Sequence, residues 1–207
     1  MKKIIPSIIS KNQKEFDKRL GKVKNLSKVF HLDVMDGKFV KNKSLNFDLA
    51  LPRKKYQIHL MVNNPERYIK IIHSKADTII FHFEATKNPE SIIKLIKSKK
   101  RKVGIAINPK TQVNGIRSHL KSVNIILIMT VHPGRYGAKF LPNTLKKIKQ
   151  LRKLKPNISI LVDGGINDKT IKKAAKAGAD SFVVGSYLQK SLNSREAMKK
   201  LKKAVEF

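Results

Sequence analysis

The chain has 207 residues, 41% of them apolar, which suits one large α/β domain or two small ones with a buried core. It has no cysteine, which excludes disulfides and thiolate metal sites, and no apolar run long enough to cross a bilayer. Lysine and arginine total 46 against 14 acidic residues, and the formal charge of +32 is typical of proteins that bind polyanions. The lysines are nevertheless spread over nearly every predicted helix. We therefore interpret the charge as a solvated surface that attracts small anions, and we expect no nucleic-acid partner.

Short runs rich in isoleucine and valine alternate with lysine-rich amphipathic segments from end to end. We predict eight strands, at residues 4–9, 29–34, 56–62, 78–82, 103–107, 125–129, 159–163 and 181–184. We predict helices at residues 13–20, 65–73, 89–98, 112–119, 142–154, 168–177 and 194–204. Pro65 and Pro89, each preceded by an asparagine, mark two helix starts. The link at residues 38–55 shows no helical periodicity, so we expect mostly loop there with at most one helical turn.

Strands separated by helices predict a parallel sheet, and eight such units in about 200 residues predict a closed (β/α)8 TIM barrel. No linker, low-complexity block or change of composition divides the chain, so we expect a single catalytic domain over residues 1–207. Pro6 interrupts the N-terminal apolar run too early for a signal peptide. We therefore expect a cytoplasmic protein.

Polar side chains occur at the ends of three predicted strands. His31 and Asp33 lie on one face of the second strand because side chains alternate, and they either ligate one divalent cation or face water. The third strand ends near His59, and the seventh ends with Asp163. Because the carboxyl ends of barrel strands meet at one rim, two imidazoles and two carboxylates are expected to converge there. This set suits Zn, Fe(II), Mn or Co, and the alternative is a buried ion network without a metal.

Glycine recurs where predicted strands turn into helices. At these places backbone amides can approach an anion, and a helix N-terminus adds a favourable dipole. Barrels commonly bind phosphate through the loops after strands seven and eight. One glycine alone would be an ordinary turn former, but three sets together favour a phosphate site. The candidates are Gly134, Gly137, Gly164, Gly165, Gly185 and Ser186.

Eight motifs occur in the order in which the ribulose-phosphate 3-epimerase family has them: PSIIS, HLDVMDGKFV, HLMV, FHFEA, GIAINPKT, LIMTVHPG, VDGGI and VVGS. The chain resembles this family over nearly its full length. The resemblance implies a metal bound by His31, Asp33, His59 and Asp163, of which the two aspartates are the catalytic acid/base pair. It implies that phosphate is held by Gly137, Gly165, Gly185 and Ser186. It also implies that the substrate lies near Ser7 and His59, and that the site beside the metal is lined by Met35, Met61 and Met129, which can fill the barrel as well.

The resemblance further implies a homo-oligomeric isomerase of the pentose phosphate pathway that interconverts D-ribulose 5-phosphate and D-xylulose 5-phosphate. Inverting a carbon beside a carbonyl requires one group to remove a proton and another to deliver one to the opposite face. A divalent metal ion stabilises the ene-diolate between the two transfers. Two alternatives remain open. One is a 3-epimerase of a ketohexose 6-phosphate such as allulose 6-phosphate, and the other is a polyanion-binding protein on a non-catalytic barrel.

The lid and phosphate loop depart from the family pattern at five positions, Lys41, His132, Arg135, Tyr136 and Ala138, and asparagine is usual at the second of these. The loop usually written GFGGQ reads GRYGA here, and proline is usual at the first of the five positions. These departures leave the identity of the sugar open. His82 and Glu84, two residues apart at the end of the fourth strand, are expected either to support the site or to be ordinary polar residues of the barrel rim, and not to form a second metal site.

Overall fold

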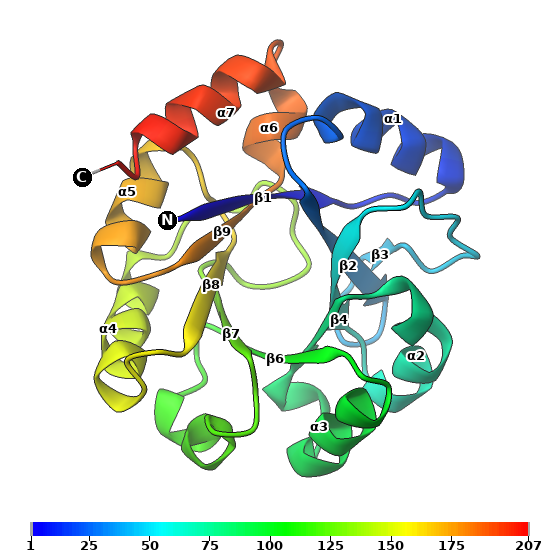
Figure 1. Cartoon of the computed structure of the whole chain (residues 1–207), viewed down its shortest axis with the longest axis vertical. Helices are drawn as coiled ribbons and strands as arrows, with labels where there is room; N and C mark the ends of the chain where they lie inside the picture. Colours follow the sequence, from blue (N-terminus) through cyan, green and yellow to red (C-terminus); the bar gives the residue numbers. More distant parts are fainter. Residues whose placement is uncertain (1, 207) are drawn as a thin grey trace.

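The barrel strands are the short apolar runs that the sequence predicts, and each begins and ends within two residues of its expected bounds. The structure is a computed structural model that describes residues 2–206. Its barrel strands are β1 (Lys3–Ile8), β2 (Val29–Asp36), β4 (Lys55–Met61), β5 (Thr78–His82), β6 (Lys102–Ile107), β7 (Ile125–Met129), β8 (Ser159–Asp163) and β9 (Ser181–Val184). Neighbouring strands pair in parallel, and a pairing between β1 and β2 closes the ring (Figure 1). The predicted (β/α)8 barrel is confirmed.

Helices surround the ring of strands (Figure 1). Before five of them stands an asparagine whose side chain accepts a hydrogen bond from a backbone N–H of the first turn. These five are α1 (Gln13–Val23), α2 (Pro65–Ile72), α3 (Pro89–Ser98), α5 (Asp168–Lys176) and α7 (Ser194–Lys203). Helix α4 (Leu145–Leu154) instead follows a 3-10 turn at Pro142–Thr144. Each of these helices buries one apolar side, and most of its lysines face solvent.

Three segments differ from the predictions. The helix predicted at residues 112–119 is a 3-10 helix, Val113–His119, because Gln112 provides no side-chain cap and Gly115 weakens an α-helix. The link at residues 38–55 contains a two-residue strand, β3 (Lys43–Ser44), antiparallel to β2, and its described residues form no helix. A short helix after β9, α6 (Ser186–Lys190), is absent from the prediction because five residues are too few to show a periodicity.

The strand register places the polar residues of the rim at one height. Asp33 on β2 is paired with His59 on β4, and Asp163 on β8 is paired with Met129 on β7. Below them the barrel is filled by apolar side chains, among them Ile5, Ile80, Leu127 and Leu161. Because this interior is closed, the rim residues are reached from the carboxyl ends of the strands. No helix within residues 2–206 has both the length and the apolar character needed to span a membrane.

Candidate metal and catalytic site

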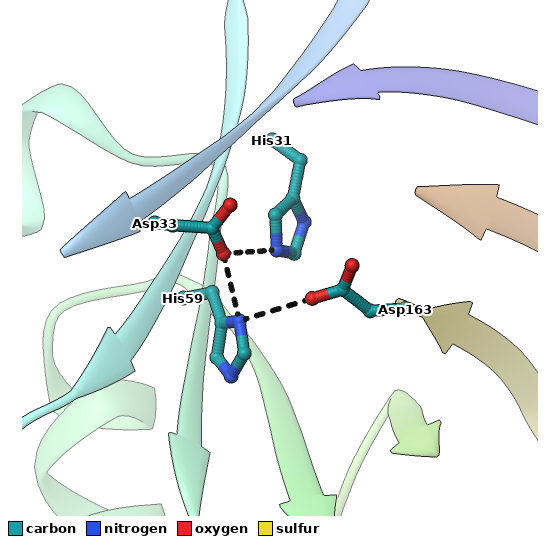
Figure 2. A group of neighbouring side chains, drawn as sticks. All are labelled: His31, Asp33, His59 and Asp163. Carbon is teal, nitrogen blue, oxygen red and sulfur yellow. Dashed lines mark hydrogen bonds and ion pairs between the residues drawn. The ribbon is translucent and has the colours of Figure 1, made fainter. Parts of the chain in front are cut away.

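Four side chains from three strands meet at the carboxyl end of the barrel: His31, Asp33, His59 and Asp163 (Figure 2). Each offers one nitrogen or oxygen atom, and these atoms all lie within 4.8 Å of one another. Asp33 Oδ1 lies 3.4 Å from His31 Nε2 and 3.1 Å from His59 Nδ1. Asp163 Oδ2 lies 3.7 Å from the same nitrogen of His59. Residues that the sequence places far apart are therefore close enough to share one ion.

The surroundings of this group fit a divalent cation. His31 and His59 are fully buried, and Asp33 is only 4% exposed. Neither ring nitrogen of His31 has a hydrogen bond of normal geometry, which is costly for a buried polar group unless an ion or water satisfies it. Imidazole and carboxylate together suit several divalent transition metals. The donor set is therefore compatible with a metal ion and does not distinguish among these metals.

Burial and mutual charge separate the pKa values of the group. Burial disfavours a charge on Asp33, but His31 and His59 beside it hold its pKa well below the usual range. Burial, together with the negative charge of Asp33, raises the pKa of Asp163 to about 7. Burial also lowers the pKa of His59 to about 4. The neighbouring carboxylates outweigh burial at His31 and raise its pKa. One ionised carboxylate thus faces another that takes up a proton readily.

His82 lies outside the four-residue group and supports the ring of His59. The rings of His59 and His82 are stacked, with centroids 4.9 Å apart, and their Nε2 atoms are 2.9 Å apart. The Nδ1 atom of His82 lies 3.2 Å from Glu84 Oε2. Asn108 donates its backbone N–H to the other oxygen of Glu84 at 2.8 Å, and the Thr111 hydroxyl donates to that oxygen as well. Because Glu84 is fixed in this way, the chain from Glu84 through His82 orients the ring of His59.

A pocket lies above the four side chains. It is lined by Asp33 and Asp163, whereas His31 and His59 lie beneath its floor. Its other walls include every further residue that the sequence suggested for the substrate: Ser7, Met35, Met61, Met129, Gly134, Gly137, Gly164, Gly165, Gly185 and Ser186. Ser7 donates its hydroxyl hydrogen to Asp33 Oδ2 at 2.6 Å. The metal-compatible group and the glycine-rich loops therefore face one common space.

Two glycines of this pocket are required by the backbone. Gly164 has φ +114°, and a Cβ added there would lie 2.4 Å from Val131 Cγ2. Gly165 has φ +65°, and a Cβ there would lie 2.7 Å from the backbone nitrogen of Phe140. Side-chain-bearing residues rarely adopt such φ angles. The loop after β8 can thus approach the loop after β7 closely, and its backbone forms the wall of the pocket.

Sequence reasoning missed two side chains that act on this site from nearby. Gln57 lies beside His31 and adds to the rise in the pKa of that imidazole that Asp33 and Asp163 cause. Its position on β4, directly opposite His31 in the strand register, is a signal that a register prediction can find. Arg19 on α1 lies against Tyr136 of the loop after β7. No local pattern marks Arg19, because its contact depends on how α1 packs.

A barrel whose carboxylates and glycine-rich loops line one pocket at the carboxyl rim, with two imidazoles beneath it, belongs to the class of (β/α)8-barrel enzymes. Solved structures with this fold agree. A 3-hexulose-6-phosphate synthase from Salmonella typhimurium superposes with a TM-score of 0.74 at 17% identity, covering 99% of this chain and 98% of that one. A KGPDC from Streptococcus mutans gives a TM-score of 0.70 at 15% identity, covering 99% of this chain and 97% of that one. At such low identity these likenesses show the fold alone.

The chain belongs to the ribulose-phosphate 3 epimerase family, whose sequence model matches residues 3–189. It is 35% identical over 213 residues to a ribulose-phosphate 3-epimerase from Schizosaccharomyces pombe, covering 98% of this chain and 93% of the relative. It is 40% identical over 185 residues to a ribulose-phosphate 3-epimerase from Methanocaldococcus jannaschii, covering 85% of this chain and 79% of that relative. The predicted family is confirmed, and the chain is an enzyme of the isomerase class.

Proposed function

We propose that the chain catalyses the 3-epimerisation of D-ribulose 5-phosphate to D-xylulose 5-phosphate with the help of one divalent metal ion. The observation that carries the proposal is the position of Asp33 and Asp163. These carboxylates come from β2 and β8, and both line the pocket that also contains the glycine-rich loops. Family membership supports the substrate, because the named relatives are ribulose-phosphate 3-epimerases.

Asp33 and Asp163 exchange the roles of base and acid according to the direction of the reaction. The carboxylate on one side of the substrate removes the proton from C3, and the carboxyl group on the other side delivers one to the opposite face. The two carboxyl groups differ in their affinity for a proton, because burial and the charge of Asp33 raise the pKa of Asp163, whereas His31 and His59 lower the pKa of Asp33. Ser7 holds Asp33 in place through its 2.6 Å hydrogen bond.

The metal would be held by His31, Asp33, His59 and Asp163, which are the four members of the buried group. In that position a divalent ion supplies Lewis-acid stabilisation for the negative charge that develops when a carbon beside a carbonyl loses its proton. The burial of the two imidazoles excludes water and strengthens this electrostatic stabilisation. Zn, Fe(II), Mn and Co remain the candidates.

The phosphate group of the substrate would bind at the other end of the pocket. Gly134, Gly137, Gly164, Gly165, Gly185 and Ser186 all line this end, and four of the five glycines have positive φ. Such backbone turns direct amide groups toward an anion. Met35, Met61 and Met129 line the pocket nearer the metal group and provide an apolar contact for the sugar carbons.

We further propose that the chain forms one catalytic domain, works as a homo-oligomer and acts in the cytoplasm. A rice relative, 33% identical over 215 residues, is named as a cytoplasmic isoform and supports the location. The spread of lysine over the helices supports a small anionic substrate and disfavours a nucleic-acid partner.

A coupled assay with ribulose 5-phosphate and allulose 6-phosphate, with and without a chelator, tests the function. We expect turnover of the pentose phosphate that a chelator abolishes and added divalent metal restores. Elemental analysis of the freshly purified protein identifies the metal. Preferential turnover of the hexose phosphate would favour the rival epimerase. Salt-sensitive RNA retention without epimerisation of either sugar would favour a non-catalytic, polyanion-binding barrel.

A further inference from the structure

Tyr136 separates the pocket from the solvent. Tyr136 lines the pocket together with Ser7 and Asp33. Its ring lies against Gly185, where an added Cβ would be 3.4 Å from the Cε2 atom of Tyr136. The same residue lines two outer grooves that also contain Arg19. Burial raises the pKa of the Tyr136 hydroxyl, although the residue is 38% exposed. The side chain is therefore a wall with one side toward the substrate site and the other toward water.

Arg19 holds this wall in place. Its guanidinium carbon lies 5.4 Å from the centroid of the Tyr136 ring, within the range of a cation–π contact. Arg19 is itself fixed, because its Nε and Nη2 atoms both donate to Glu15 Oε1, at 3.0 and 2.7 Å. The other oxygen of Glu15 accepts the backbone N–H of Lys11 at 2.8 Å. An arginine that is already ordered loses little entropy when the ring stacks on it.

The loop that carries Tyr136 is also attached on its other side. Asn42, in the link after β2, donates its side-chain N–H to the carbonyl oxygen of Gly134. Gly134 packs so closely that an added Cβ would lie 2.6 Å from Val40 Cβ. The loop after β7 is therefore bound both to the link after β2 and to α1, and the position of the Tyr136 ring is defined from both sides.

We propose that Tyr136, positioned by Arg19, is a specificity-determining residue that limits the length of the ketose phosphate which the pocket accepts, so that five carbons are favoured over six. This inference rests on the proposed function. The buried metal-compatible group fixes one end of the substrate and the glycine-rich loops fix the other. An additional carbon between two fixed ends must bulge sideways, and the Tyr136 ring occupies one of the walls there.

Arg19 has a different role from Tyr136. It lines the outer grooves and does not line the pocket, so it acts through the ring and is a positioning residue. Its removal leaves the ring in the chain but frees it to move. Both changes should therefore relax the selectivity for sugar length in the same direction, with the larger effect from removal of the ring.

The test compares kcat/KM for ribulose 5-phosphate with kcat/KM for allulose 6-phosphate in metal-loaded protein. In Tyr136→Ala we expect the hexose-to-pentose ratio to rise about tenfold, since one carbon in a fitted pocket is discriminated by about 10- to 200-fold. Tyr136→Phe keeps the ring and loses only the hydroxyl, so it should retain the wild-type ratio. An unchanged ratio in Tyr136→Ala would overturn the inference.

Arg19→Ala provides a second route that leaves the loop sequence intact. We expect it to raise the same ratio about threefold, within the range of a cation–π contact at a partly exposed site. Lys18→Ala is its matched control, because it removes one positive charge from the same helix and lines the groove beside Tyr136. An equal rise in both variants would show a general charge effect and contradict the positioning role of Arg19.

Failure of this inference can be told apart from failure of the proposed function. A wild-type protein that epimerises neither sugar with metal present overturns the proposed function, and the inference with it. An active wild type that prefers the pentose phosphate, with a Tyr136→Ala variant of the same preference, overturns only the role of Tyr136. Thermal unfolding of each variant shows whether it is folded before its kinetics are compared.

Discussion

The two ends of the pocket are formed by different parts of the chain, one by side chains on strands and the other by loops. At the metal-compatible end the donor atoms belong to side chains on strands, and His31, Asp33 and His59 are almost completely buried. At the other end, loops with glycines at positive φ form the wall, and Arg135 and Tyr136 are exposed. All departures from the family pattern that concern the pocket fall at the loop end. Strand register therefore fixes the positions of the donor atoms, whereas the loops can vary in sequence without disturbing them.

The largest effect is expected from the strand end. Asp163→Asn removes one of the two groups proposed to transfer the proton, so kcat should fall by about 10²- to 10⁴-fold in the coupled assay at saturating metal. Metal content is measured in parallel, because Asp163 also belongs to the metal-compatible group. Asp17→Asn on the exposed side of α1 is the control for loss of one carboxylate. Near-normal turnover of Asp163→Asn would remove the proposed mechanism.

A smaller effect, on metal affinity, is expected from His82, which contacts His59 and does not line the pocket. His82→Phe keeps an aromatic ring between His59 and Phe39 but removes the nitrogen that lies 2.9 Å from His59 Nε2. We expect metal affinity, measured by competition with a chelator, to fall by about 10- to 100-fold, while kcat recovers at saturating metal. His73→Phe, at the end of α2 on the outside of the barrel, is the matched control. Unchanged metal affinity would show that His82 is only packing.

The loop end should respond differently. Gly165→Ala introduces a Cβ 2.7 Å from the Phe140 nitrogen at a φ of +65°, so the loop must shift. KM for the sugar phosphate should rise about tenfold, equivalent to about 1.4 kcal/mol, while metal affinity stays at the wild-type level. Gly21→Ala lies in α1 with nothing within 4 Å of the added Cβ, and should stabilise the protein by up to about 1 kcal/mol. A Gly165→Ala protein that loses metal and keeps KM would contradict the division between the two ends.

The last effect concerns stability and pH, and it leaves turnover and substrate binding aside. Hydrogen bonds from His82, Thr111 and Asn108 outweigh burial and lower the pKa of Glu84 to about 2. A group whose folded pKa is lowered stabilises the fold above its unfolded pKa, near 4.5 here, and loses that contribution as the pH falls toward 2. The wild type should therefore be about 1–2 kcal/mol more stable than Glu84→Gln at pH 7, after allowance for the partial exposure of the side chain. Denaturant unfolding of both proteins at pH 7 and at pH 2 measures this difference in unfolding free energy. A difference that is equal at the two pH values would contradict the prediction.

Elements with a strong local signal were predictable. Apolar runs bounded by lysines located the barrel strands, and Asn-Pro pairs located the starts of α2 and α3. The segment at residues 112–119 has apolar residues at helical spacing, but without a cap and with Gly115 inside it forms only 3-10 turns. The short elements β3 and α6 carry too few residues for any periodicity, and their neighbours hold them in place.

The sequence by itself determined which polar residues converge at the rim, because strand alternation puts His31 and Asp33 on one face and a parallel barrel brings strand ends together. Only the tertiary structure decided that Asp163 lies 3.7 Å from His59, that His82 stacks on His59, and that Arg19 reaches Tyr136. The physical reason is the sequence separation over which each interaction acts. Side-chain alternation and helix caps act between residues close in the chain, whereas these distances depend on the closure of the barrel by all its strands and on the packing of α1.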